Sequence, residues 1–198
     1  MKLILVRHGE TKANIEKIMQ GHLPGELTEK GKEQAKKVGG RLKNEKIDLI
    51  VVSDLKRAVD TAKPIIKNHP ESKVIFEERI RERNLGVFEG KPYGSFSEAA
   101  EKAGMPVEKF KPERGESIEE SYARAKEFFD ELINREKGRT VAVISHGGFL
   151  TNALIYLLRK SREEYLDLHP KNTALTILEI KDDRNHEVIR LNCVEHLE

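Results

Sequence analysis

The sequence begins MKLILVRHGETKAN (residues 1–14), in which an aliphatic run leads directly into an arginine, a histidine and a glycine. Residues 3–6 contain no polar side chain, which is typical of a strand covered on both faces, since a half-exposed strand would alternate apolar and polar residues. Gly9 permits a turn that bulkier residues resist. Reactive groups in open α/β sheets gather at the carboxyl ends of strands. Arg7 and His8 are therefore either site residues or ordinary polar residues at a strand end.

Strand-like and helix-like segments alternate along the rest of the chain. Further apolar runs occur at residues 47–52, 74–76, 141–144, 175–180 and 188–191. Strands that alternate with helices predict an α/β fold in which a mostly parallel sheet lies between helix layers.

The expected helices begin at recognisable capping residues. Thr28 can cap a helix that continues to about Leu42. Ser53 or Asp54 can cap a second helix. A capping-box pattern at residues 117–120 opens a third, and another helix is expected directly after the strand at 141–144.

The alternating pattern lapses over about residues 83–116. This stretch is rich in Gly, Pro and charged residues, with one short helix expected around residues 96–103. We interpret it as a small cap insertion over one end of the sheet. The 198 residues fit a single domain, 1–198, that is long enough for a sizeable core.

Composition excludes several classes of function. The 36 basic and 34 acidic residues give a net charge of +2, without the basic patch that nucleic-acid binding requires. No apolar run approaches the ~18 residues of a membrane span, and the N-terminus lacks a secretion signal, so we expect a cytoplasmic protein. A single cysteine, Cys193, excludes an internal disulfide and a cysteine-based metal cluster.

A second junction repeats the form of the first. The strand TVAVIS (residues 140–145) leads into His146, Gly147 and Gly148 and then into a helix, whose free N–H groups would attract an anion. The strand at 47–52 is followed by Arg57, one helical turn on. Two histidines, at least two arginines and a helix N-terminus at neighbouring strand ends would together suit a phosphoryl group.

Five motifs in order then identify a family resemblance. They are RHGET (7–11), SDLKRAVDTA (53–62), RERNLGVFEG (81–90), GES (115–117) and SHGG (145–148). The chain resembles the phosphoglycerate-mutase-like branch of the histidine phosphatase superfamily from residue 3 to about residue 180. The resemblance implies a three-layer α/β/α sandwich and a covalent phosphohistidine mechanism that needs no metal and no other cofactor.

The resemblance also implies roles for individual residues. His8 matches the nucleophile, whose other ring nitrogen must keep its proton by donating it to a backbone carbonyl. Glu82 matches the general acid that protonates the leaving oxygen and later takes a proton from water. Without the motif, Glu82 would read as one of several surface carboxylates.

The remaining site residues would bind the phosphoryl group and line the entrance. The equatorial oxygens would be surrounded by Arg7, Arg57 and His146, with Asn14 and the backbone N–H of Gly147 completing the pocket. Gln20 and Gly21 would line the substrate entrance. The pairing of His8 and His146 could resemble a metal site, but the arginines would repel a cation, so no metal is expected.

One loop departs from the family pattern. Pro24 and Glu26 occupy positions where the family usually has other residues, which leaves the loop shape and specificity open. Of the histidines outside the motifs, His22 lies near the expected entrance and is a candidate substrate contact. The others, His69, His169, His186 and His196, are expected to be solvated.

The sequence thus favours a phosphomonoester hydrolase that acts on a small phosphorylated metabolite. Two alternatives stay open: a cofactor-dependent phosphoglycerate mutase, and an inactive protein that only binds a phosphorylated ligand. A nucleic-acid or membrane partner is not expected. The oligomeric state is left open, with a homodimer among the options, and the physiological substrate cannot be named.

Overall fold

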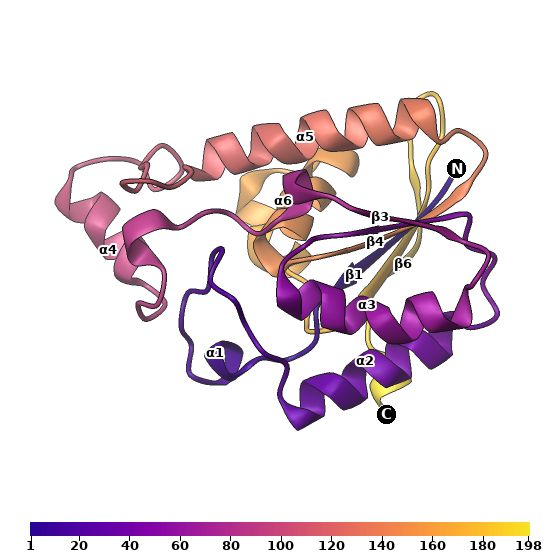
Figure 1. Ribbon diagram of the computed structural model, residues 1–198. Coiled ribbons are helices and arrows are strands. Elements are labelled where there is room, and N and C mark those ends of the chain that lie inside the picture. Colours follow the sequence, from indigo (N-terminus) through magenta and orange to yellow (C-terminus); the bar gives the residue numbers. More distant parts are fainter.

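The computed structural model describes all 198 residues and contains one central six-stranded sheet (Figure 1). The strands are β1 (Lys2–Arg7), β2 (Leu49–Val52), β3 (Lys73–Phe76), β4 (Thr140–Ser145), β5 (Leu175–Glu179) and β6 (Glu187–Cys193), in the order β3-β2-β4-β1-β5-β6. The neighbours from β3 to β1 pair in parallel, whereas β5 is antiparallel to both β1 and β6. The mostly parallel sheet expected from the alternating pattern is confirmed.

Helices cover both faces of this sheet. They are α1 (Lys12–Ile15), α2 (Glu29–Leu42), α3 (Lys56–Asn68), α4 (Ser95–Lys102), α5 (Ile118–Arg135), α6 (Gly147–Leu157) and α7 (Tyr165–Leu168). Figure 1 shows α2 and α3 on one face and α5 and α6 on the other. The α/β/α layering is therefore confirmed. No helix combines the length and the apolar character needed to cross a membrane.

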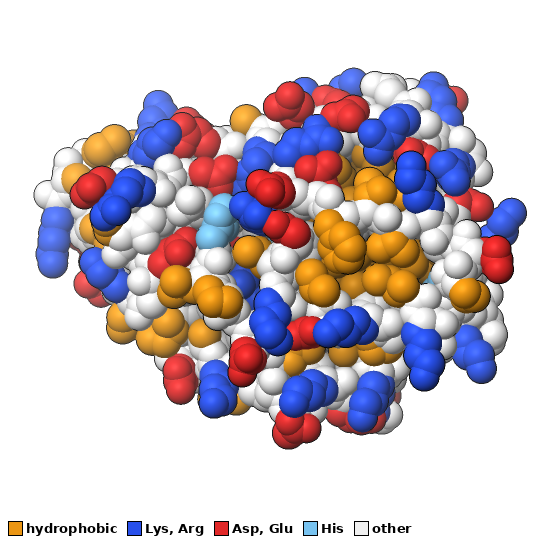
Figure 2. All heavy atoms as spheres, viewed as in Figure 1, with side chains coloured by type: hydrophobic (Ala, Val, Ile, Leu, Met, Phe, Trp, Pro, Cys, Tyr) orange, Lys and Arg blue, Asp and Glu red, His pale blue; other side chains and the backbone are white.

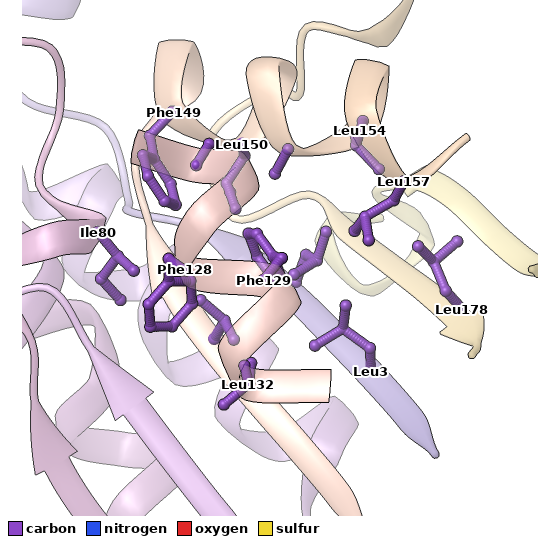
Figure 3. Close-up of a cluster of buried hydrophobic side chains, with 14 of the residues drawn as sticks. Leu3, Ile80, Phe128, Phe129, Leu132, Phe149, Leu150, Leu154, Leu157 and Leu178 are labelled. Carbon is purple, nitrogen blue, oxygen red and sulfur yellow. The ribbon is translucent and has the colours of Figure 1, made fainter. Parts of the chain in front are cut away.

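The central strands divide their side chains between two cores. Leu3 and Leu5 of β1 belong to the core under α5 and α6, together with Phe128 and Phe129 of α5 (Figure 3). Ile4 and Val6 belong to the core under α2 and α3. Because successive side chains of a strand point to opposite faces, the unbroken aliphatic run of β1 serves both cores at once.

Two of the three expected helix caps are present. Thr28 accepts from the backbone N–H of Gly31 (2.9 Å), and Ser117 and Glu120 form the expected capping box at the start of α5. The expected cap of α3 is wrong, because this helix begins at Lys56 and has no side-chain cap.

Ser53 and Asp54 have other partners instead. The hydroxyl of Ser53 contacts the ring of His146, and the carboxylate of Asp54 pairs with Arg81. The N-cap position of α3 is Leu55, which follows both residues and has no side-chain oxygen to accept from the first turn of the helix.

Residues 83–116 pack around a small apolar cluster of their own. Leu85, Phe88 and Phe96 are buried there, and Phe96 packs edge-on against Phe110 with 5.2 Å between ring centroids. The short helix expected in this stretch is present as α4. Elsewhere, basic and acidic side chains are interspersed across the surface view, without a region of one sign (Figure 2).

Candidate active site

Strand register brings the two strand-end histidines together. Arg7 at the end of β1 pairs with Ser145 at the end of β4, so His8 and His146 follow at the same edge of the sheet. The backbone N–H of His8 donates to the Ser145 carbonyl (2.9 Å), and the two imidazole centroids lie 5.3 Å apart. Parallel neighbours in a sheet place equivalent junctions side by side, which is why similar sequence at residues 3–9 and 141–147 produces one site.

The imidazole of His8 is held as one tautomer. Its Nδ1 lies 2.8 Å from the carbonyl oxygen of Gly9, and a carbonyl can only accept, so Nδ1 carries the proton. Burial, followed by the charges of Arg57 and Arg7, lowers the pKa of His8 well below its ordinary value. The ring is therefore neutral near pH 7, with the lone pair on Nε2 free.

His146 is buried behind His8 and is also neutral. Arg57 donates through Nε to its Nδ1 (3.2 Å), so the ring proton lies on Nε2 and is donated to the hydroxyl of Ser53 (2.7 Å). Burial, followed by Arg57, lowers the pKa of His146 well below its ordinary value.

Arg57 is a charged group in the interior of the protein. Only 1% of the residue is exposed, and its two Nη atoms donate to the carbonyls of Leu23 (2.9 Å) and Gly21 (2.8 Å). Burial lowers its pKa to about 10, so it stays charged near pH 7. Arg57 thereby ties the loop at residues 21–23 to His146.

Arg7 has hydrogen-bonding capacity left over. Its Nη1 donates to the carbonyl of Pro170 (2.6 Å) and lies 3.3 Å from Nε2 of His169, whereas its buried Nε has no partner. A buried donor without a partner costs free energy unless a ligand fills the role.

Glu82 lies against the first turn of α6. Its carboxylate accepts from the backbone N–H groups of Gly148 (2.9 Å), Phe149 (3.1 Å) and Arg83 (2.9 Å). A Cβ at position 148 would lie 2.6 Å from the Glu82 carboxylate oxygen, so glycine is needed for this close approach. The free N–H groups of a helix N-terminus attract the carboxylate.

These groups surround a cavity of about 350 Å³. The predicted site residues that line it are Arg7, His8, Asn14, Gln20, Gly21, Arg57, Glu82 and Gly147. Of the residues given a catalytic or phosphoryl-binding role, only His146 does not line the cavity, because it is fully buried. Further lining residues outside the predicted set are Met19, Arg83, Leu85, Tyr93, Gly148, Tyr165, Leu166 and His169.

The amide of Asn14 is held in place by its neighbours. Its Oδ1 accepts from the backbone N–H of Thr11 (3.1 Å) and from Nδ2 of Asn172 (3.2 Å). Asn172 also donates to the carbonyl of His8 (3.0 Å). The oxygen of Asn14 is therefore occupied, while its NH₂ group is available to a ligand in the cavity.

The expectation that the other histidines are solvated is wrong for two of them. His69 is only 8% exposed and contacts the Leu42 carbonyl through Nε2 (3.1 Å). His169 lines the cavity, because the pairing of β5 with β1 brings the residues before β5 to the end of β1. His186 and His196 are partly exposed.

His22 contacts the general-acid candidate and not the cavity. Its Nε2 donates to the backbone carbonyl of Glu82 (2.8 Å), and its backbone N–H donates to Glu89 (2.7 Å). The entrance loop is thus joined to the segment that carries Glu82. No group of three or more His, Cys, Asp or Glu side chains in the structure has an arrangement suited to a metal ion.

Comparison with known proteins gives consistent matches over the whole chain. The family model described as histidine phosphatase superfamily (branch 1) matches residues 3–193. Phosphoglycerate mutase-like protein 4 from Arabidopsis thaliana is 32% identical over 203 residues, covering 100% of this chain and 87% of that protein.

Two further matches carry names that describe phosphatases. The fructose-2,6-bisphosphatase TIGAR from Xenopus tropicalis is 42% identical over 134 residues, covering 66% of this chain and about half (49%) of that protein. The crystal structure of a phosphoserine phosphatase variant from Entamoeba histolytica, in complex with phosphoserine, superposes with a TM-score of 0.84 at 27% identity. That match covers 100% of this chain and 99% of the other.

Proposed function

Because this chain belongs to the histidine phosphatase superfamily, we propose that it hydrolyses phosphate monoesters of small metabolites, with His8 as the nucleophile. One observation carries the proposal. His8 is neutral, its Nδ1 proton is held by Gly9, and its free Nε2 belongs to a cavity that Arg7 and Arg57 also line. A neutral imidazole among fixed positive charges is arranged to attack a phosphorus atom.

In the first step the Nε2 lone pair of His8 attacks phosphorus as the bond to the ester oxygen breaks. The Nδ1 proton stays on the ring, because the Gly9 carbonyl holds it. The leaving oxygen takes a proton from Glu82, which lines the same cavity as His8. The products of this step are the free alcohol and a phosphohistidine.

In the second step water attacks phosphorus and the P–N bond breaks. Glu82, now a carboxylate, takes a proton from the water, and the electron pair of the broken bond returns to Nε2 of His8. Inorganic phosphate leaves. The enzyme then has its starting protonation state, so the cycle closes without a metal or an oxidant.

The charge of the transferring group would be stabilised by donors that are already in place. Arg7 offers its unpartnered Nε, and Arg57 holds a full charge in the interior. The Asn14 amide and the backbone N–H of Gly147, the first residue of α6, lie along the same cavity. Donors fixed before the reaction cost no reorganisation in the transition state.

Cavity size and relatives both support a small substrate. A volume of about 350 Å³ is near the lower end of ligand pockets, which usually range from ~300 to 1,000 Å³. Two of the relatives named above are, by their names, phosphatases of fructose 2,6-bisphosphate and phosphoserine. We assign selection of the leaving group to the cap segment 83–116, which contributes Arg83, Leu85 and Tyr93 to the cavity.

The test measures phosphate release from an aryl phosphate and from a panel of phosphorylated metabolites, with His8→Ala as the matched control. We expect release by the wild type and almost none by the variant. A second reaction contains 3-phosphoglycerate with a trace of 2,3-bisphosphoglycerate and follows 2-phosphoglycerate and free phosphate together. If 2-phosphoglycerate forms much faster than phosphate, the protein is a mutase. If nothing turns over, it is a binding protein.

A further inference from the structure

We propose that His169 is a positioning residue that fixes the orientation of Arg7 by accepting a hydrogen bond from its guanidinium. The consequence for catalysis rests on the function proposed above, whereas the hydrogen-bond arrangement itself does not. No sequence motif singled out His169.

The direction of each hydrogen bond around His169 follows from its partners. Arg7 only donates, so Nε2 of His169, 3.3 Å from Nη1 of Arg7, must accept. The hydroxyl of Thr151 lies 2.7 Å from the Gly147 carbonyl, which only accepts, so the single hydroxyl proton points there. The Thr151 oxygen, 3.0 Å from Nδ1 of His169, therefore accepts the Nδ1 proton. Only the His169 tautomer with the proton on Nδ1 is compatible with all of these hydrogen bonds.

This row of hydrogen bonds, from Arg7 through His169 and Thr151 to Gly147, connects two walls of the cavity. Arg7 ends β1, and Gly147 is the first residue of α6. The contact is close as well as polar, since a Cβ at position 147 would lie 2.7 Å from Cε1 of His169 and 3.1 Å from Cζ of Arg7. His169 therefore fills the space between the strand end and the helix start and joins them through hydrogen bonds.

The same hydrogen bonds determine which N–H groups of Arg7 remain available to a ligand. His169 and the carbonyl of Pro170 (2.6 Å) both engage Nη1, while the buried Nε has no partner. A guanidinium held at one Nη atom cannot swing freely, so its remaining N–H groups keep one direction. In the proposed reaction those N–H groups bind the phosphoryl oxygens.

The surroundings of His169 keep it in the accepting form. The ring lies between the Arg7 guanidinium and Tyr165 of α7, with 5.7 Å between the centroids of the two rings. Burial, followed by the charge of Arg7, lowers the pKa of His169 to about 4, and the charge of Glu82 opposes this. Protonation would direct an N–H of the ring at an N–H of Arg7 and remove the acceptor.

The test compares His169→Gln with His169→Leu. Glutamine can present an oxygen to Arg7, whereas leucine fills the space without an acceptor. His169→Leu should lower kcat/KM for an aryl phosphate by about 10- to 100-fold, the usual range for losing a hydrogen bond to a charged group. Inhibition by inorganic phosphate should weaken by a similar factor. His169→Gln should keep most of the wild-type kcat/KM and of the inhibition by phosphate. His186→Leu, at a residue away from the cavity, should change neither quantity.

A spectroscopic measurement tests the arrangement without turnover. Long-range ¹H–¹⁵N NMR of the wild-type imidazoles should report His169 as the Nδ1–H tautomer near pH 7. The Nε2–H tautomer would overturn the proposal, as would equal losses for the glutamine and leucine variants when both are folded. If the wild type hydrolyses no phosphate ester, the proposed function fails alone, and the NMR result with phosphate binding by calorimetry still decides the role of His169.

Discussion

Replacing Arg57 with methionine should separate activity from stability. The buried guanidinium makes three hydrogen bonds, to His146 and to the carbonyls of Gly21 and Leu23. A pKa lowered to about 10 by burial corresponds to a cost of about 3 kcal/mol for holding the charge in the folded state. Three hydrogen bonds at about 1 kcal/mol each offset a similar amount.

Removing the charge and the hydrogen bonds together should therefore change the free energy of unfolding by no more than about 2 kcal/mol relative to the wild type. For a chain of this size, that corresponds to a shift of a few degrees in Tm. Catalysis has no such compensation. Losing a donor to the transferring phosphoryl group should lower kcat/KM for an aryl phosphate by about 1,000-fold. The assays are thermal unfolding and initial rates of phosphate release.

The matched control is Arg190→Met, since Arg190 is exposed and pairs with the exposed carboxylate of Glu195. It should change neither quantity appreciably. Retention of kcat/KM within about tenfold by Arg57→Met would refute the catalytic role. A fall in Tm of more than about 10 °C would refute the estimate that charge burial and hydrogen bonding cancel.

Four other outcomes are expected. Glu82→Gln removes the acidic proton at constant side-chain volume. It should lower kcat/KM for alkyl phosphates by ~100-fold or more, and for aryl phosphates by less, because their leaving groups need less protonation. Equal losses for the two classes would contradict the role of Glu82 as the acid. Because His8 stays neutral well below its ordinary pKa, kcat/KM should show no loss from an ionisation near pH 6.5. The unfolded chain alone takes up protons at His8 and His146 as the pH falls below about 6.5, so the free energy of unfolding by urea should decrease there. EDTA should leave activity unchanged and vanadate should inhibit, whereas loss in EDTA that a divalent ion restores would contradict a metal-free reaction.

The fold was largely predictable because its signals are local. The unbroken aliphatic runs of β1 and β4 indicate strands buried on both faces, and the Ser117–Glu120 capping box marks the start of α5 within the sequence itself. The cap of α3 was mispredicted because the helix begins only at Lys56, with Leu55 at its N-cap, while Ser53 contacts His146, a residue 93 positions away. A contact with a residue so distant along the chain cannot be predicted from the local sequence around Ser53.

The lining of the candidate site was predictable where the family resemblance assigned residues to it and not elsewhere. His8, Glu82 and Arg57 lie in motifs that resemble a known family, and all three line the cavity. His169 and Tyr165 reach the same cavity only because β5 pairs antiparallel with β1, an orientation that hydrophobic periodicity does not encode. The tautomers of the histidines likewise depend on partners that only the three-dimensional structure brings together.

The most direct test of the phosphohistidine mechanism is to trap the intermediate. The enzyme is mixed with a ³²P-labelled aryl phosphate, quenched in alkali within milliseconds to seconds, digested and analysed by mass spectrometry. We expect label that is stable to alkali and labile to acid, on the peptide that contains His8, and more of it in Glu82→Gln, because hydrolysis of the intermediate needs that carboxylate. His8→Ala should carry none. Turnover by the wild type with no trapped label in either protein, or label on a residue other than His8, would contradict the mechanism.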